Sequence, residues 1–145
     1  METTNLFPID IEFVGDDIIM LRSEYFDDER TVYMDGRGHP DPSEVTLDGH
    51  SIGHWEGDVL VVDTRNFAFH RSPYQMGVPS GNQKHVVERY QLINDGERLL
   101  VEFILEDPEY LVGTMTHSRE LVYSPQLPLN RWDCDMESSS RFVPR

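Results

Sequence analysis

Residues 84–106 read KHVVERYQLINDGERLLVEFILE, and they contain two runs rich in branched and aromatic residues around the sequence NDGE. Such runs favour β-strands, because these side chains fit a pleated, half-buried surface. Asparagine, aspartate and glycine between them tolerate the positive φ values of a tight turn. The stretch therefore predicts an antiparallel β-hairpin.

The rest of the chain repeats this pattern of short strands and turns. Further strands are predicted at 9–14, 18–25, 30–34, 51–55, 59–64, 111–123 and 131–137. Residues 35–50 and 66–83 are predicted to be long loops of the kind that often bind ligands. About eight to ten strands with regular turns indicate an all-β barrel or sandwich. We expect residues 1–145 to form one antiparallel up-and-down β-barrel, lipocalin- or calycin-like, with an interior pocket.

Composition narrows the classes of partner. The chain has 27 acidic and 12 basic residues and a formal net charge of −15, which argues against nucleic acid or an anionic membrane as a partner. Its one cysteine, Cys134, excludes an intramolecular disulfide. The start lacks the basic and apolar regions of a secretory signal, and no apolar run is long enough to span a bilayer. We expect a cytoplasmic protein, and a homodimer is one assembly that it could form.

Side chains able to do acid–base chemistry are dense between residues 30 and 64. Tyr33, Asp35 and Arg37 are spaced by two, so on a continuing strand they would share a side. Arg37 would keep Asp35 ionised, and the Tyr33 phenol could donate a proton. Alternatively, Asp35 and Gly36 form a turn that Arg37 ties down through a structural ion pair.

Four histidines extend this group. His39 and His85 are the better candidates for a general base, whereas His50 and His54 could be solvated loop residues. Their spacing does not match a metal site, and we predict no metal and no cofactor. Asp63 stands in an apolar strand, so its carboxylate must be hydrogen-bonded or exposed. His85 or Arg89 from a neighbouring strand could supply the partner.

Five further residues are predicted to bind substrate. His85 and Arg89 share one side of their strand, and we expect both in the barrel interior, with Glu88 outside. The Trp55 indole is expected to pack in the barrel, beside a turn at 56–58 and close to His54. His117 and Arg119 share a face with apolar residues of their strand. A partly polar barrel interior or a dimer contact would produce that mixture.

Two motifs, DGRGHP at 35–40 and GHSIGHWEGDVLVVDT at 49–64, have close counterparts elsewhere. With residues 85–89 and 107–108, they resemble a family of small, mostly uncharacterised bacterial β-barrel proteins. The resemblance covers a little over half of the chain and implies the barrel fold, but no settled reaction. Many of those proteins carry secretory leaders, and their C-terminal strand is only loosely matched by residues 132–137.

The residues favour a cofactor-independent lyase, isomerase or hydratase acting on a small, partly aromatic metabolite inside the barrel. Tyr33, Asp35, His39 and His85 are the predicted catalytic residues. Substrate-binding residues are predicted at Arg37, His54, Trp55, Asp63, Arg89, His117 and Arg119. Two alternatives stay open: a lipocalin-like binding protein without catalysis, and a structural or oligomerisation module.

Overall fold

The computed structural model describes residues 8–75 and 78–130. Its strands are β1 (Ile9–Val14), β2 (Ile18–Ser23), β3 (Asp28–Tyr33), β4 (His50–Glu56), β5 (Val59–Arg65), β6 (His70–Gln75), β7 (Val78–Ser80), β8 (His85–Ile93), β9 (Arg98–Glu106) and β10 (Met115–Val122). Two single 3-10 turns, η1 (Tyr25–Asp27) and η2 (Asn94–Gly96), complete the regular structure of these ranges. The predicted all-β class is confirmed. Within the same ranges, no helix has the length and apolar character to cross a membrane.

Eight strands form one sheet in the order β1-β2-β3-β4-β5-β8-β9-β10, while β6 and β7 form a separate ribbon. Neighbours are antiparallel except β3 and β4, which run parallel with Val32 opposite Ser51 and Tyr33 opposite Ile52. A parallel pair needs a crossover of about a dozen residues or more, which the loop 34–49 provides. The sheet is therefore mixed, and the prediction of a wholly antiparallel meander is wrong at this connection.

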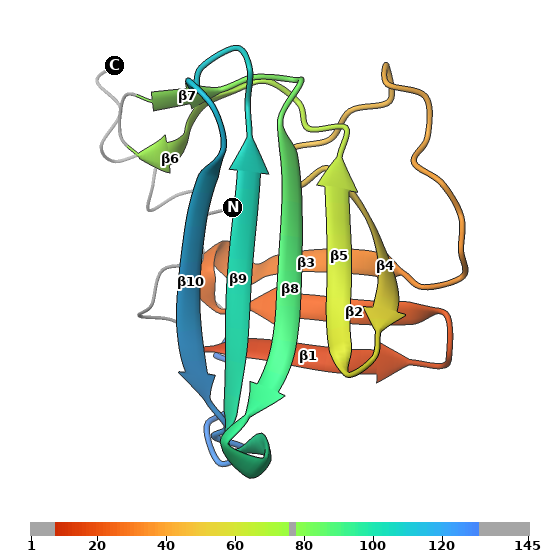
Figure 1. The fold of residues 1–145 in the computed structure, drawn as a ribbon, viewed down its shortest axis with the longest axis vertical. Coiled ribbons are helices and arrows are strands. Elements are labelled where there is room, and N and C mark those ends of the chain that lie inside the picture. The colour runs from red at the N-terminus through yellow and green to blue at the C-terminus, as the bar shows by residue number, and fades with distance from the viewer. Residues whose placement is uncertain (1–7, 76–77, 131–145) are drawn as a thin grey trace, which may run out of the picture.

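The sheet is strongly curled. Strands β1–β3 run across behind β5 and β8–β10, and β4 links the two groups (Figure 1). Because the strand order begins at β1 and ends at β10, the described strands form a half-barrel. Closure into a lipocalin-like barrel is not confirmed.

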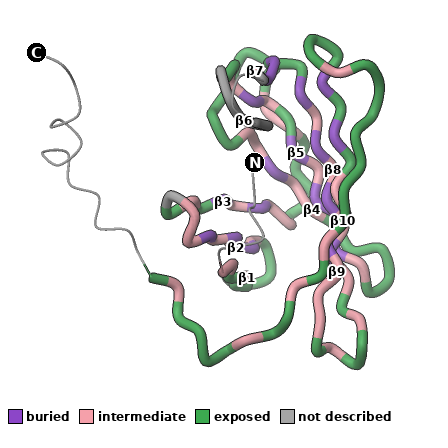
Figure 2. Tube along the Cα trace, turned by 90° about the vertical axis from the view of Figure 1, so that its left-hand side faces the viewer, coloured by how far each residue is buried: buried purple, intermediate pink, exposed green. Residues whose placement is uncertain are grey.

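A hydrophobic core lies between the two layers of the curled sheet (Figure 2). Its buried members are Ile19, Leu21, Val32, Leu60, Val62, Tyr90 and Val101. On β8, Val86, Glu88 and Tyr90 are buried while the residues between them are only half-buried, as the two-residue period of a strand requires. The side chains of this core thus occupy part of the space in which we expected a ligand.

The turns and strand ends agree with the sequence in most places. Gly57 between β4 and β5, and all three residues of η2 between β8 and β9, have positive φ values, as the turn residues predicted. The predicted loop 66–83 carries the β6–β7 ribbon. Strand β10 begins at Met115 rather than at 111, because the N–H groups of Tyr110 and Leu111 turn back to the carbonyl of Asp107. The strand predicted at 131–137 lies outside the described residues.

Candidate functional site

Asp63 on β5 connects side chains from separate parts of the chain. His39 Nε2, from the loop 34–49, lies 2.9 Å from Asp63 Oδ1, and His85 Nε2, on β8, lies 2.8 Å from Oδ2. Arg65 Nε donates to Oδ1 at 3.2 Å. Both carboxylate oxygens of Asp63 therefore accept hydrogen bonds from imidazole rings.

Strand register explains why Asp63 and His85 meet. Val62 and Thr64, on either side of Asp63, are fully buried in the core, so Asp63 projects from the opposite, outer face of the sheet. Asp63 lies opposite Val87 on the antiparallel strand β8. His85, two residues before Val87, projects from the same face. Of the two candidate partners for Asp63, His85 is thus the one that meets it. The prediction that His85 lies in the interior is wrong, because it projects from the outer face.

His50, the first residue of β4, extends the group. Its Nδ1 lies 3.2 Å from the Nδ1 of His39. We call Asp63, His39, His50 and His85 the Asp63 cluster. A solvated loop position was one possibility for His50 and His54; His54 is exposed, but His50 is half-buried in β4. The parallel pairing of β3 with β4 places His50 beside Tyr33 and His39. No local sequence pattern predicts that pairing.

Tyr33 and Arg37 close one side of His50. The Tyr33 ring stacks on the His50 ring with centroids 5.1 Å apart and planes at 19°. The Arg37 guanidinium carbon lies 3.9 Å from the centre of the Tyr33 ring, a cation–π distance. The order Arg37, Tyr33, His50 is thus a stack that holds the His50 ring in place.

Asp35 does not share a strand face with Tyr33, because β3 ends at Tyr33. Gly36 has φ +78°, and Asp35 Oδ1 accepts the backbone N–H of Arg37 at 3.1 Å. The Arg37 Nε is 2.9 Å from both oxygens of the same carboxylate. This is the turn and structural ion pair weighed as the alternative, and it fixes Arg37 over Tyr33.

The protonation states of the Asp63 cluster follow from its surroundings. Burial opposes ionisation of Asp63, but the hydrogen bonds from His85 and His39 outweigh it and hold the pKa of this carboxyl below its usual value. Burial, together with the charges of His39 and Arg37, lowers the pKa of His50 below its usual 6.5. At neutral pH, Asp63 is therefore an anion and His50 a neutral imidazole.

A second polar group, which the sequence analysis missed, lies on the inner face. Arg30 Nη1 lies 2.6 Å from Glu88 Oε2, and the two side chains are 5% and 1% exposed. The Tyr90 hydroxyl donates to Glu88 Oε1 at 3.1 Å, and Arg30 also donates to Thr64 Oγ1 at 3.1 Å. Burial and the adjacent Glu88 raise the pKa of Tyr90, which stays a neutral phenol. The sequence did contain a pattern that indicates this buried group: Glu88 alternates with Val86 and Tyr90, so the three side chains share one face of β8.

Glu88 and Arg89 therefore lie on the faces of the sheet opposite to those predicted. Glu88 points into the core, while Arg89 lies on the outer face and forms an ion pair with Glu56 at 2.9 Å. Trp55 is 52% exposed and does not pack inside. His54 is exposed beside Glu56 at 3.3 Å. None of these hydrogen bonds or ion pairs joins Arg89, Trp55 or His54 to the Asp63 cluster.

His117 and Arg119 lie on β10, on the inner face. His117 stacks on Phe103 with ring centroids 6.2 Å apart, and the Arg119 guanidinium carbon is 5.0 Å from the centre of the same ring. They are thus on the opposite side of the sheet from the Asp63 cluster. Across the described part of the chain, no group of three or more histidine, cysteine, aspartate or glutamate side chains could hold a metal ion.

Comparisons with known proteins add no relative. The chain matches no protein-family model, and neither the curated proteins nor the solved structures give a match. The family resemblance of the two motifs stays a prediction. Function must therefore be argued from the chemistry of the two polar groups.

Proposed function

We propose that the Asp63 cluster is the acid–base site of a cofactor-independent enzyme of the lyase or isomerase type. The supporting observation is the continuous path from the Asp63 carboxylate through His39 to His50. A histidine held by a carboxylate at one ring nitrogen is oriented to exchange a proton at the other.

The hydrogen-bond directions define the roles. Ionised Asp63 only accepts, so His39 donates its Nε2 hydrogen to Asp63 at 2.9 Å. A neutral His39 then accepts at Nδ1, and His50 must supply the Nδ1 hydrogen. That tautomer leaves the lone pair on His50 Nε2. His50 is thus the proposed base, and the cation formed when it takes a proton is stabilised through His39 by Asp63.

His85 and Tyr33 complete the site. His85 donates to the second oxygen of Asp63, and its own Nδ1 lies 3.6 Å from Glu106 Oε2, on the next strand. His85 is the proposed acid: in its doubly protonated form it gives its own Nδ1 hydrogen to the substrate, while His50 keeps the proton that it has taken. Proton exchange with water then restores both rings. Tyr33 and Arg37 position His50 through the stack. The Tyr33 ring and the Arg37 charge also offer a surface for a polar, planar substrate. The substrate is a small molecule on the outer face beside the loop 34–49.

Lyases and isomerases of this kind begin by removing a proton from carbon next to a carbonyl group. The test is therefore incubation in D₂O with a panel of small keto acids and hydroxy acids, followed by NMR of deuterium incorporation. Exchange above buffer is expected with at least one compound. His50→Gln and Asp63→Asn should each lower its rate roughly a hundredfold, the usual weight of a general base.

His54→Gln is the matched control, because His54 is an exposed histidine outside the Asp63 cluster. Among the described residues, its side chain pairs with Glu56 alone. Circular dichroism checks that each variant is folded. The proposal would be contradicted if His50→Gln and Asp63→Asn exchanged deuterium at the wild-type rate. Absence of exchange with every compound of the panel would contradict it as well.

A further inference from the structure

The hairpin of β8, η2 and β9, together with the end of β10, extends beyond the layer formed by β1–β3. Figure 1 shows these strand ends reaching below β1, and Figure 2 shows the same overhang from the side. Among the described strands, none covers the inner face of the sheet at these ends. Side chains on this part of the inner face therefore lie outside the core.

Leucine side chains occupy the uncovered face. Leu92, Leu99 and Leu121 lie opposite one another on β8, β9 and β10. Leu92 is two residues beyond the core residue Tyr90 on the same strand, so both project from the inner face. Leu92 is nevertheless 65% exposed. The leucine row thus continues the apolar surface of the core into solvent.

Two aromatic side chains extend this row to either side. The Tyr123 N–H donates to the carbonyl of Glu97, which continues the ladder of β9 and β10 and places the Tyr123 side chain on the same face as Leu121. Trp55 lies opposite the core residue Leu60, so its indole is on the inner side of the sheet too. The exposed fractions of Tyr123 and Trp55 are 74% and 52%. We call Trp55, Leu92, Leu99, Leu121 and Tyr123 the Leu92 patch.

The dimensions of the Leu92 patch suit a helix. From β4 through β5, β8 and β9 to β10 the patch crosses four neighbouring strand pairs, which is about 19 Å at the usual strand spacing. A helix of about 13 residues has this length. The apolar stripe of an amphipathic helix is a common occupant of such a face.

Carboxylates surround the Leu92 patch. Asp58 lies in the turn between β4 and β5, and Asp95 and Glu97 lie in and directly after η2. All three residues are exposed, and none of them forms an ion pair within the described part of the chain. Basic side chains of a partner could therefore reach these carboxylates at both sides of the patch.

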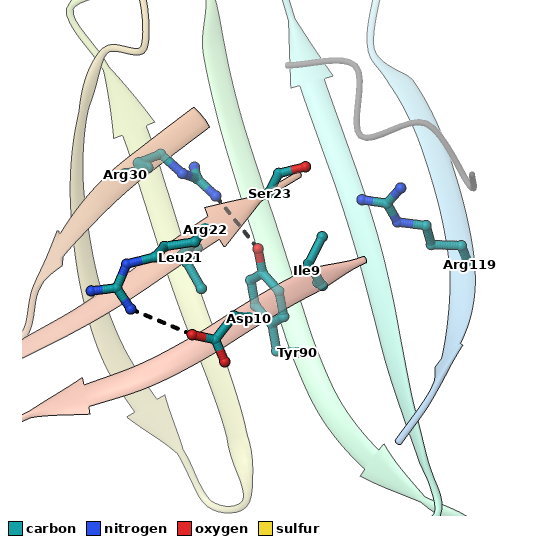
Figure 3. Close-up of a pocket in the computed structure, with 8 residues that line it drawn as sticks. All are labelled: Ile9, Asp10, Leu21, Arg22, Ser23, Arg30, Tyr90 and Arg119. Carbon is teal, nitrogen blue, oxygen red and sulfur yellow. Dashed lines mark hydrogen bonds and ion pairs between the residues drawn. The ribbon is translucent and has the colours of Figure 1, made fainter. Parts of the chain in front are cut away.

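The nearby arginines do not offset these charges. Arg89 pairs with Glu56 at 2.9 Å, and Arg98 pairs with Glu120 at 3.3 Å. Arg119 extends from β10 into the half-barrel (Figure 3). The three arginines are thus outnumbered by Glu56, Glu120 and the three exposed carboxylates, and the whole chain has a net charge of −15. A basic partner is attracted to this end of the sheet, whereas a second copy of the chain or an anionic membrane is disfavoured.

We infer that the Leu92 patch binds a basic amphipathic helix of a partner protein, with its apolar stripe on the patch and its basic side chains beside Asp58, Asp95 and Glu97. Leu92 is at the opposite end of β8 from His85 of the Asp63 cluster. The interaction is therefore independent of the proposed acid–base reaction.

The test is a titration, followed by isothermal calorimetry, with a synthetic helical peptide of about 14 residues. Leucines form one stripe of this peptide, and its other residues are lysines. A peptide with the same leucines and glutamates in place of the lysines is the ligand control. The lysine peptide is expected to bind with a dissociation constant of about 10 μM or less, and the glutamate peptide at least tenfold more weakly. Added salt should weaken binding of the lysine peptide, because salt screens exposed charges.

Leu92→Ser is the principal variant, since an exposed leucine can be replaced with little effect on the core. It should weaken the lysine peptide at least tenfold, the scale of one leucine side chain buried on binding. Leu47→Ser is the matched control, because Leu47 is 63% exposed in the loop 34–49. Glu97→Gln should weaken the lysine peptide severalfold, while Glu44→Gln, in the same loop as Leu47, should leave its affinity unchanged.

Tyr123→Ser is the second variant, in case Leu92→Ser does not fold, and the same loss is expected of it. Equal affinities for the two peptides, or no binding of the lysine peptide up to about 1 mM, would overturn the inference. Wild-type affinity in Leu92→Ser, or an equal loss in Leu47→Ser, would overturn it as well. If sedimentation showed a dimer that Leu92→Ser dissociates, the occupant would be a second copy of the chain, and the inferred partner would be wrong.

Discussion

The Nδ1 atoms of His39 and His50 lie 3.2 Å apart, so one ring must donate a hydrogen and the other must accept it. Because His39 already donates its Nε2 hydrogen to Asp63, the neutral pair has a single consistent arrangement, with the hydrogen on Nδ1 of His50. The carboxylate of Asp63 thus sets the tautomer of a ring that it does not touch.

The first prediction concerns these tautomers. In Asp63→Asn, one oxygen of the carboxylate becomes an NH₂ group, which can donate but not accept. One of His39 and His85 must then present a bare Nε2 to that group, and its tautomer should change. Nitrogen NMR of the histidine rings would record the change. Two unchanged Nε2–H tautomers in the variant would contradict the hydrogen-bond directions given above.

Stability should also depend on pH through the Asp63 cluster. The pKa values of His50 and Asp63 are both lower in the folded state than their usual 6.5 and 3.8, so the unfolded chain binds more protons. Their contribution is fully present above the unfolded pKa values and is lost as pH falls, first below about 6.5 through His50 and then below about 4 through Asp63. Urea denaturation between pH 7.5 and 5 should show the first loss, and His50→Gln should flatten it. If the free energy of unfolding of His50→Gln depended on pH as steeply as that of the wild type, other groups would be responsible for the loss.

The third prediction concerns the buried ion pair. Replacing Glu88 by Gln leaves the Arg30 charge in the core without a counter-charge, and such a loss costs roughly 3–5 kcal/mol. Arg30→Met combined with Glu88→Leu removes both charges and should be considerably more stable than Glu88→Gln. Urea denaturation measures both. The exposed pair of Arg98 and Glu120 is the control, and breaking it by Glu120→Gln should cost less than about 1 kcal/mol. Equal costs at the two sites would contradict the prediction.

The sequence was informative where the fold depends on local patterns. The apolar run around Asp63 was enough to predict that its carboxylate needs a hydrogen-bond partner or exposure, with His85 or Arg89 of a neighbouring strand as candidates; the structure has His85 in that place. The sequence could not place His50, because His50 meets Tyr33 and His39 only through the parallel crossover of β3 to β4. Glu88 was assigned to the outside because it alternates with His85 and Arg89, which were assigned to the interior. Its buried partner, Arg30, comes from a distant strand that no local pattern indicates.

The last prediction tests the contact between β3 and β4 that this crossover creates. A Cβ added to Gly53 on β4 would lie 2.6 Å from Met34 Sδ and 2.9 Å from Val32 Cγ1, closer than such atoms can approach. Gly53→Ala should therefore push the two strands apart and cost roughly 1–3 kcal/mol, as overpacking does. Gly38→Ala is the matched control, because a Cβ there meets nothing within 4 Å. Urea denaturation would show a lower midpoint for Gly53→Ala alone. Because Tyr33 and His50 lie on the same pair of strands, the NMR shifts of the His50 ring should move in this variant too. If Gly53→Ala were as stable as Gly38→Ala, β4 could not lie against Val32 and Met34 as described.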